Sequence, residues 1–301
     1  MTAHPNDPAG EQPCDYRNVL PDDASDYDRG VVEGGLTAEE QDWLRRQRRE
    51  WEARCGGGPL SAEELVDRHT IDVVPARWAR FAEYLPFETD GQACLPLSRR
   101  AVTDVARECR GSGAWLPLLV TSFAWGWGKR GFGPARLSWI LNGRGPLPGL
   151  SPGEIDNRLA AAVQVLDDQG GRDAYQLLLE RSRIPGFGPA FFTKFLYFAI
   201  RTDDERCLAP ILDKRLARQM WCFWERRAGE AYAVNGPAAR WLWRGPRWSS
   251  RRYQVYRAFM CRAAVQLSAS GERWTPELVE LLLFRGEPDD GPDGQQCRVP
   301  D

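Results

Sequence analysis

The sequence has 301 residues, 43% of them hydrophobic and 11% aromatic, which is enough apolar material for one large domain or two small ones. It contains no run of about 18 apolar residues, and its polar, acidic start lacks the basic and apolar regions of a signal peptide. We therefore expect neither a membrane span nor secretion, and place the protein in the cytoplasm.

Metal-binding patterns are missing from the sequence. None of its eight cysteines forms a CxxC pair, and it holds only two histidines, His4 and His69. Zinc and iron–sulfur sites need clustered thiolates or imidazoles. We expect no metal, no cofactor and no histidine that acts as a general base.

The net charge of -2 is distributed unevenly along the chain. Residues 1–36 carry eight acids and two arginines, and residues 287–301 carry five acids and one arginine. Residues 37–286 therefore hold about +8. We expect a disordered acidic arm and a disordered acidic tail on either side of a basic helical domain, whose charge suits a polyanionic partner.

Helical patterns run through this domain. Capping boxes, in which Ser or Thr is followed three residues later by Glu, predict helix starts at Thr37, Ser61 and Ser151. Other helices are expected over 74–85, 98–108, 172–183, 249–267 and 275–284. No stretch alternates with period two for long enough to indicate a strand. The sequence therefore predicts an all-α fold.

One stretch combines glycines, aromatic rings and positive charge. No acid lies between residues 109 and 153, and the segment 123–136 reads FAWGWGKRGFGPAR. Glycines allow a backbone to approach a ligand, and flat rings stack on bases. The segment is therefore either a nucleic-acid contact that uses Lys129 and Arg130, or a connector whose rings fill the core. The candidate base-stacking rings are Trp125, Trp127 and Phe132.

The clearest functional pattern lies in residues 183–220. A Pro-Gly-Phe-Gly turn at 185–188 opens into an apolar helix that begins at Pro189. Gly186 and Gly188 let the chain reverse sharply and leave the first amides of that helix accessible, and such amides suit a backbone phosphate. The alternative is an ordinary corner between two helices.

Two residues after this turn carry reactive groups. Lys194 lies on the apolar helix, and Asp213 lies on a helix that we expect to begin near Ala209. Only three of the forty basic residues are lysines, and the other two are Lys129 and Lys214. A lysine amine, unlike a guanidinium, can lose its proton and act as a nucleophile, although a lysine can equally be retained for its apolar stem.

The order of these features resembles the helix-hairpin-helix DNA glycosylase superfamily. The segments IPGFG at 184–188 and ILDKRLAR at 211–218 are most similar to its 8-oxoguanine glycosylase branches, and the resemblance covers roughly residues 172–220. It implies two helical subdomains around a cleft, and a monomer that binds double-stranded DNA containing a damaged or modified base. We expect Lys214 and Arg215 to contact that DNA, together with the hairpin.

The resemblance also implies roles for the two reactive groups. Asp213 matches an aspartate that stabilises the cationic sugar as the base departs and positions or deprotonates the nucleophile. Strand-cleaving members use a lysine whose amine attacks C1′ and forms a Schiff base. That lysine comes two residues after the second hairpin glycine, where this chain has Ala190, and Lys194 lies one helical turn further on. The rings expected to give Lys194 apolar surroundings are Phe191, Phe192, Phe195 and Phe198.

Three functions are open at this point. The first is a DNA glycosylase with AP-lyase activity that uses Lys194 and Asp213 to remove an oxidised or modified purine such as 8-oxoguanine. The second is a monofunctional glycosylase in which Asp213 activates water and Lys194 is a buried structural residue. The third is a helix-hairpin-helix protein that binds DNA without catalysis.

Overall fold

The structure of the chain is a computed structural model. It describes residues 16–20, 22, 24–91, 93–144, 147–200, 208–231 and 249–286. Helices make up most of these ranges, which confirms the all-α prediction. None of the helices in the described ranges is long and apolar enough to cross a membrane.

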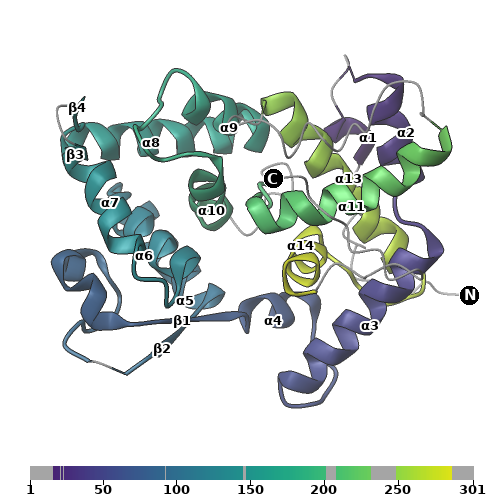
Figure 1. The fold of residues 1–301 in the computed structure, drawn as a ribbon, viewed down its shortest axis with the longest axis horizontal. Coiled ribbons are helices and arrows are strands. Elements are labelled where there is room, and N and C mark those ends of the chain that lie inside the picture. The colour runs from purple at the N-terminus through teal and green to yellow at the C-terminus, as the bar shows by residue number, and fades with distance from the viewer. Residues whose placement is uncertain are drawn as a thin grey trace, which may run out of the picture.

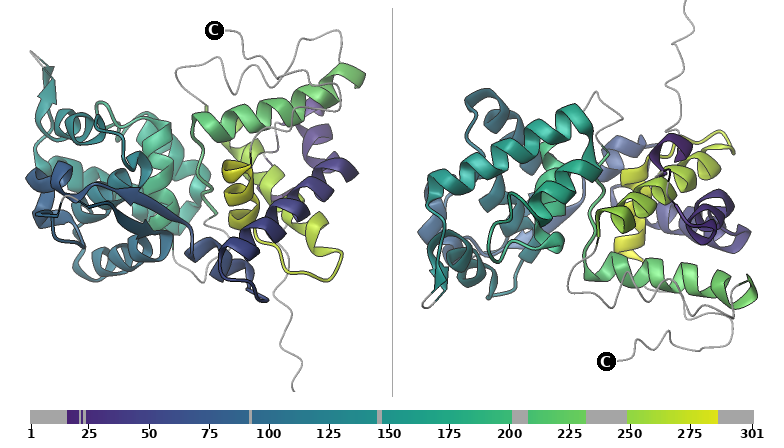
Figure 2. Two further views of the ribbon diagram at one scale, coloured as in Figure 1. Left: turned by 60° about the horizontal axis from the view of Figure 1, so that its bottom comes forward. Right: turned by 90° about the horizontal axis from the view of Figure 1, so that it is seen from above.

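The helices form two groups (Figures 1 and 2). The first group contains the 3-10 helix η1 (Pro75–Tyr84), α5 (Arg99–Ser112), α6 (Leu116–Trp127), α7 (Gly133–Asn142), α8 (Pro152–Gln169), α9 (Gly171–Leu179) and α10 (Pro189–Ala199). The second contains α1 (Tyr16–Val19), α2 (Asp26–Gly34), α3 (Ala38–Arg54), α11 (Lys214–Ala231), α13 (Ser250–Ser268) and α14 (Pro276–Arg285). These groups correspond to the two expected subdomains. They meet where α9 packs on α13, and α4 (Ala62–Asp67) lies between them, in contact with α5 of the first group and α14 of the second.

The acidic arm is partly folded, so the expectation of disorder over residues 1–36 is wrong for its second half. Helices α1 and α2 pack on α13, and Val31, Val32 and Leu36 are buried there. The Leu36 amide donates to Oε1 of Gln266 at 2.6 Å. A few apolar residues in an acidic segment give a weak sequence signal, but α13 offers a surface that buries them. Residues 1–15 and the predicted tail, 287–301, lie outside the described residues.

Two short antiparallel strand pairs correct the expectation that no strand forms. Strand β1 (Thr70–Val73) pairs with β2 (Leu95–Ser98), and β3 (Gly143–Arg144) pairs with β4 (Leu147–Pro148). Each strand has four residues or fewer. Such short strands cannot display an alternation that sequence reasoning can detect.

Most predicted helix starts agree with the structure because they depend on local capping. Thr37, Ser61 and Ser151 each accept a hydrogen bond from the backbone amide three residues on, with the reciprocal glutamate bond also present. Two boundaries around the central turn differ. The helix expected over 172–183 ends at Leu179, and the helix expected near Ala209 begins at Lys214.

Candidate active site

The predicted turn joins α9 to α10 and lies on the surface. The amide of Phe187 donates to the carbonyl of Ile184 at 3.0 Å, and Gly186 has φ +83°. A Pro followed by a glycine with positive φ is the sequence that a type II turn requires. Arg136 of α7 fixes the turn from the side, because its Nη2 donates to the Gly186 carbonyl at 3.0 Å.

Gly188 is the N-cap of α10, and no side chain caps this helix. Its carbonyl accepts from the amides of Phe191 and Phe192 at 2.9 and 3.0 Å. A Cβ built on Gly188 would meet no atom within 4 Å. The first turn of α10 therefore begins on an open backbone, and of the two glycines only Gly186 has a positive φ.

Lys194 is buried in the middle of α10, with 7% of its surface exposed. Its Nζ donates to the carbonyl of Ala190 at 2.9 Å and to Oδ2 of Asp213 at 3.1 Å. The stem crosses Gly126 of α6, where a Cβ would lie 2.8 Å from Cδ of Lys194. Thus the side chain points back toward the start of α10, and its amine lies beside the backbone of Ala190.

Asp213 is held from two sides. Its Oδ1 accepts from the amides of Arg215 and Leu216 at 3.0 and 3.1 Å, as an N-cap of α11, while Oδ2 accepts from Lys194. Burial raises the pKa of the carboxyl, but Lys194 and the two amides outweigh burial and hold it below its usual range. Asp213 is therefore a carboxylate at neutral pH.

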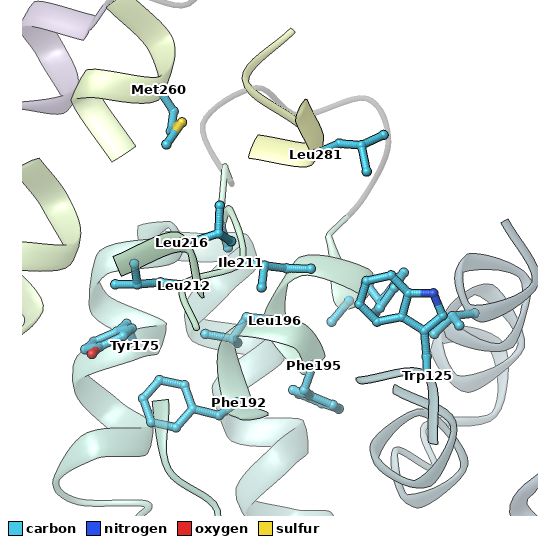
Figure 3. Packing of buried hydrophobic residues seen from close by; sticks show 14 of the residues in the cluster. Trp125, Tyr175, Phe192, Phe195, Leu196, Ile211, Leu212, Leu216, Met260 and Leu281 are labelled. Atoms are coloured by element: carbon cyan, nitrogen blue, oxygen red, sulfur yellow. The ribbon is translucent and has the colours of Figure 1, made fainter. Parts of the chain in front are cut away.

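The segment that carries Asp213 is fixed by its neighbours. The hydroxyls of Tyr253 and Tyr256 on α13 donate to the carbonyls of Pro210 and Ile211 at 2.9 and 2.8 Å. From the other side, Thr193 accepts from the amide of Leu212 through Oγ1 at 3.2 Å. Figure 3 shows the apolar side chains of this segment packed next to α10. Both α10 and α13 thus determine where Asp213 lies.

The turn and the Lys194–Asp213 pair fall inside a recognisable family region. A sequence model of the family described as "Putative 8-oxoguanine DNA glycosylase OGG-like protein" matches residues 64–284. The chain belongs to this family. No curated protein and no solved structure matches it. Membership supports a DNA glycosylase-type activity and makes DNA the expected substrate.

Three phenylalanines of α10 pack into the core of this OGG-like protein. Phe192, Phe195 and Phe198 are buried, and their rings pack against Tyr175, Trp115 and Trp125, respectively. The hydrogen-bond partners of the Lys194 amine are a carboxylate and a carbonyl. An α-helix projects its side chains in several directions, so these rings have partners on different elements, and their closeness to the nitrogen stays a prediction.

The three candidate base-stacking rings have different surroundings. Trp125 is 3% exposed, and its ring packs edge-on against His69 and Phe198, so it belongs to the core. Trp127 is half-buried and stacks on Phe191 with ring centroids 5.8 Å apart. Phe132 is 49% exposed and touches Trp127 edge-on. The structure thus aligns Phe132, Trp127 and Phe191 in a row that starts at the surface.

The predicted basic contacts fall on two surfaces. Lys129 and Arg130 are exposed after α6, and Nζ of Lys129 lies 2.8 Å from Oδ2 of Asp72. Lys214 and Arg215 begin α11, and both are exposed. Arg215 also donates to two carbonyls at the end of α14, those of Arg285 and Gly286, at 3.3 and 3.4 Å. A helix-capping role for Arg215 was not visible in the sequence.

Sequence reasoning missed two residues that shape the site. Gly126 makes room for the Lys194 stem, and Thr193 ties the Asp213 segment to α10. Gly126 lies in the glycine-rich stretch, but its partner is distant in sequence and could not be inferred. Within the described residues, no group of three or more His, Cys, Asp or Glu side chains is placed to hold a metal ion.

Proposed function

We propose that this OGG-like protein removes an oxidised or modified purine, such as 8-oxoguanine, from double-stranded DNA and then cleaves the strand as an AP lyase. Lys194 is the nucleophile and Asp213 is its partner. The observation that carries the proposal is the 3.1 Å contact between Nζ of Lys194 and Oδ2 of Asp213, directly after the turn between α9 and α10.

The chemistry follows from this contact. Asp213 accepts a proton from the Lys194 ammonium, and the neutral amine attacks C1′ of a nucleotide that has been rotated out of the duplex. The bond between C1′ and the base breaks, and its electron pair leaves with the base. Asp213 passes that proton to the departing base, so it is again a carboxylate and stabilises the cationic sugar. The C1′–O4′ bond of the sugar then breaks, O4′ takes up a proton, and C1′ and the Lys194 nitrogen form the Schiff base from which β-elimination proceeds.

The duplex is held by main-chain and basic groups in this proposal. The exposed turn with Gly186 and Gly188 binds a backbone phosphate through the start of α10, without reading sequence. Lys129 and Arg130 add charge on one side, and Lys214 adds it on the other. Phe132 offers an exposed ring on which a base can stack.

Borohydride trapping tests the proposal. The protein is incubated with a duplex containing 8-oxoguanine and with reductant, and we expect a covalent adduct that Lys194→Gln abolishes. Lys129→Gln is the matched control, because it also removes one lysine but should still trap at saturating duplex. Asp213→Asn should lower both base release and trapping.

Other outcomes identify the alternatives. Base release without trapping, lost in Asp213→Asn but kept in Lys194→Gln, would assign a monofunctional glycosylase that activates water. The existing bond from Lys194 to the Ala190 carbonyl is the observation that favours this alternative, since it suits a structural lysine. Salt-dependent duplex binding with base and strand intact would assign a DNA-binding protein without catalysis.

A lysine exchange along α10 tests whether the displaced position matters. The double variant Ala190→Lys with Lys194→Ala moves the amine back by one turn, toward the turn at 185–188. If Lys194 is the nucleophile from its own position, this variant traps less than wild type. A variant that traps better than wild type would show that the reacting sugar lies near Ala190 instead.

A further inference from the structure

A second buried ion pair lies away from the residues assigned so far. Arg99 of α5 donates to both oxygens of Glu280 on α14, at 3.0 and 3.2 Å. The two residues are 181 positions apart in the sequence, and each side chain is 1% exposed. Burial lowers the pKa of Arg99, but Glu280 and Tyr197 together outweigh burial and raise it, so the guanidinium stays charged.

Two further donors of Arg99 are also used. Its Nη1 donates to the hydroxyl of Tyr197 on α10 at 2.9 Å, and its Nε donates to Nδ1 of His69 at 3.2 Å. Burial and the charge of Arg99 lower the pKa of His69 to about 2, so His69 is neutral and can accept this bond. Arg99 is therefore a hub that joins α5, α10, α14 and the residue before β1.

This hub is connected to the Lys194–Asp213 pair on both sides. Tyr197 follows Lys194 by three residues on α10, so both belong to one turn of helix. Glu280 lies on α14, whose last carbonyls accept from Nε2 of Gln219 at 3.2 and 3.0 Å. Gln219 belongs to α11, the helix that Asp213 caps. These contacts therefore connect α10, α5, α14 and α11 in a closed ring, and the Lys194–Asp213 pair is one of its links.

A buried ion pair contributes little net stability, because desolvation offsets its attraction. Its geometry is nonetheless specific, since a bidentate arginine fixes the carboxylate in one plane. Here that geometry joins the group of helices that holds Lys194 to the group that holds Asp213. We therefore expect Arg99 and its partners to determine how the two groups of helices are positioned relative to each other, more than they stabilise either group.

We propose that Arg99, Tyr197 and Glu280 form a positioning network that holds the Lys194 amine against Asp213 by fixing α10 relative to α14. These residues do not touch the substrate. This inference rests on the proposed function only for its consequence in catalysis, because the placement of the amine can be measured without any activity.

The deciding variant is Tyr197→Phe, because it removes one hydroxyl and leaves the Arg99–Glu280 pair intact. The chain has only three lysines, so protein labelled with 13C at lysine Cε gives three signals, and Lys194→Gln assigns the one of interest. We expect Tyr197→Phe to shift the Lys194 signal and to leave those of Lys129 and Lys214 in place. An unchanged Lys194 signal would overturn the proposal.

Asp167→Asn is the matched control for lost stability. Asp167 of α8 forms a bidentate pair with Arg110 of α5 at 2.8 and 2.9 Å, so α5 loses a comparable contact in this variant. We expect its Lys194 signal to match wild type even if its melting temperature falls as far as that of Tyr197→Phe. Equal shifts of the Lys194 signal in both variants would reduce the network to an ordinary structural role.

Catalysis provides an independent readout. In single-turnover trapping on an 8-oxoguanine duplex, Tyr197→Phe should react about fivefold more slowly, the effect of one typical hydrogen bond. Its affinity for the duplex should equal that of wild type, because the network lies inside the protein. A lower affinity with an unchanged rate would contradict positioning. If wild type itself forms no adduct, the proposed function fails while the lysine signals still test the network.

Discussion

Two ion pairs in the described part of the chain, Lys194–Asp213 and Arg99–Glu280, differ in design. Lys194 and Asp213 share one contact of 3.1 Å, and their side chains are 8% and 17% exposed. Arg99 and Glu280 share two contacts, and both side chains are 1% exposed. The first pair uses a cation that can release its proton, whereas the second uses one that cannot.

This difference matches two tasks. A reactive pair has to exchange a proton and meet a substrate, so a single contact and some solvent access are useful. A positioning pair has to keep one geometry, so two parallel bonds and complete burial are useful. Burial alone therefore does not identify a reactive group, because the more buried pair is the one that we assign to positioning.

The largest effect on stability is expected for Arg99→Met. This change leaves the Glu280 carboxylate buried without its partner, which should cost about 3–5 kcal/mol in the free energy of unfolding. Urea unfolding at pH 7 measures it. The double variant with Glu280→Leu should recover most of the loss, since no charge then remains buried. If Arg99→Met alone lowers the free energy of unfolding by less than about 1 kcal/mol, the Arg99–Glu280 pair does not have the structural role that distinguishes it from Lys194–Asp213.

A smaller effect is expected where the Lys194 stem crosses α6. Gly126→Ala places a Cβ 2.8 Å from Cδ of Lys194, so the lysine or α6 has to shift. Such overpacking should cost about 1–3 kcal/mol and should lower borohydride trapping. Gly111→Ala in α5 is the matched control, because its Cβ meets no atom within 4 Å. That control should be as stable as wild type or slightly more stable.

Asp213→Ala should lower the free energy of unfolding by about 0.5–2 kcal/mol, because α11 loses its N-cap as well as the Lys194 contact. Urea unfolding at pH 7 measures it.

Asp213→Asn keeps a side chain that can cap α11 and removes only the negative charge, so it measures the contribution of that charge. The folded pKa of Asp213 is lowered from its ordinary value of 3.8, so the charge stabilises the fold above that pH. This advantage over Asn should disappear as the pH falls through the lower folded pKa. Urea unfolding of wild type and Asp213→Asn at several pH values checks it. A difference in unfolding free energy that grows as the pH falls would contradict the lowered pKa of Asp213.

The smallest loss is expected for Lys194→Met, which keeps the apolar stem. Asp213 retains its two amide bonds and partial access to water, so the cost should be about 0.5–1 kcal/mol. Thermal unfolding measures it beside Arg99→Met. The same variant should form no borohydride adduct, so stability and trapping separate the roles of the two cations. A cost equal to that of Arg99→Met would place Lys194 among the structural residues.

Local features were predictable because they depend on neighbours in the chain. The capping boxes at Thr37, Ser61 and Ser151 formed as expected, and so did the turn with Gly186 at positive φ. The resemblance between short motifs predicted related roles for Lys194 and Asp213, and the structure places Nζ and Oδ2 of these residues 3.1 Å apart. Fine boundaries were less predictable, since α11 starts at Lys214 where Asp213 caps it.

The sequence by itself thus determined the helical class, the tight turn and the candidate pair Lys194 and Asp213, because capping, glycine conformation and helical periodicity act over a few residues. Only the tertiary structure decided that Trp125 belongs to the core, that α2 packs on α13, and that Arg99 meets Glu280. Those outcomes depend on which surfaces meet across long separations in the chain. Burial then selects the partners that leave the least unpaired charge and exposed apolar area.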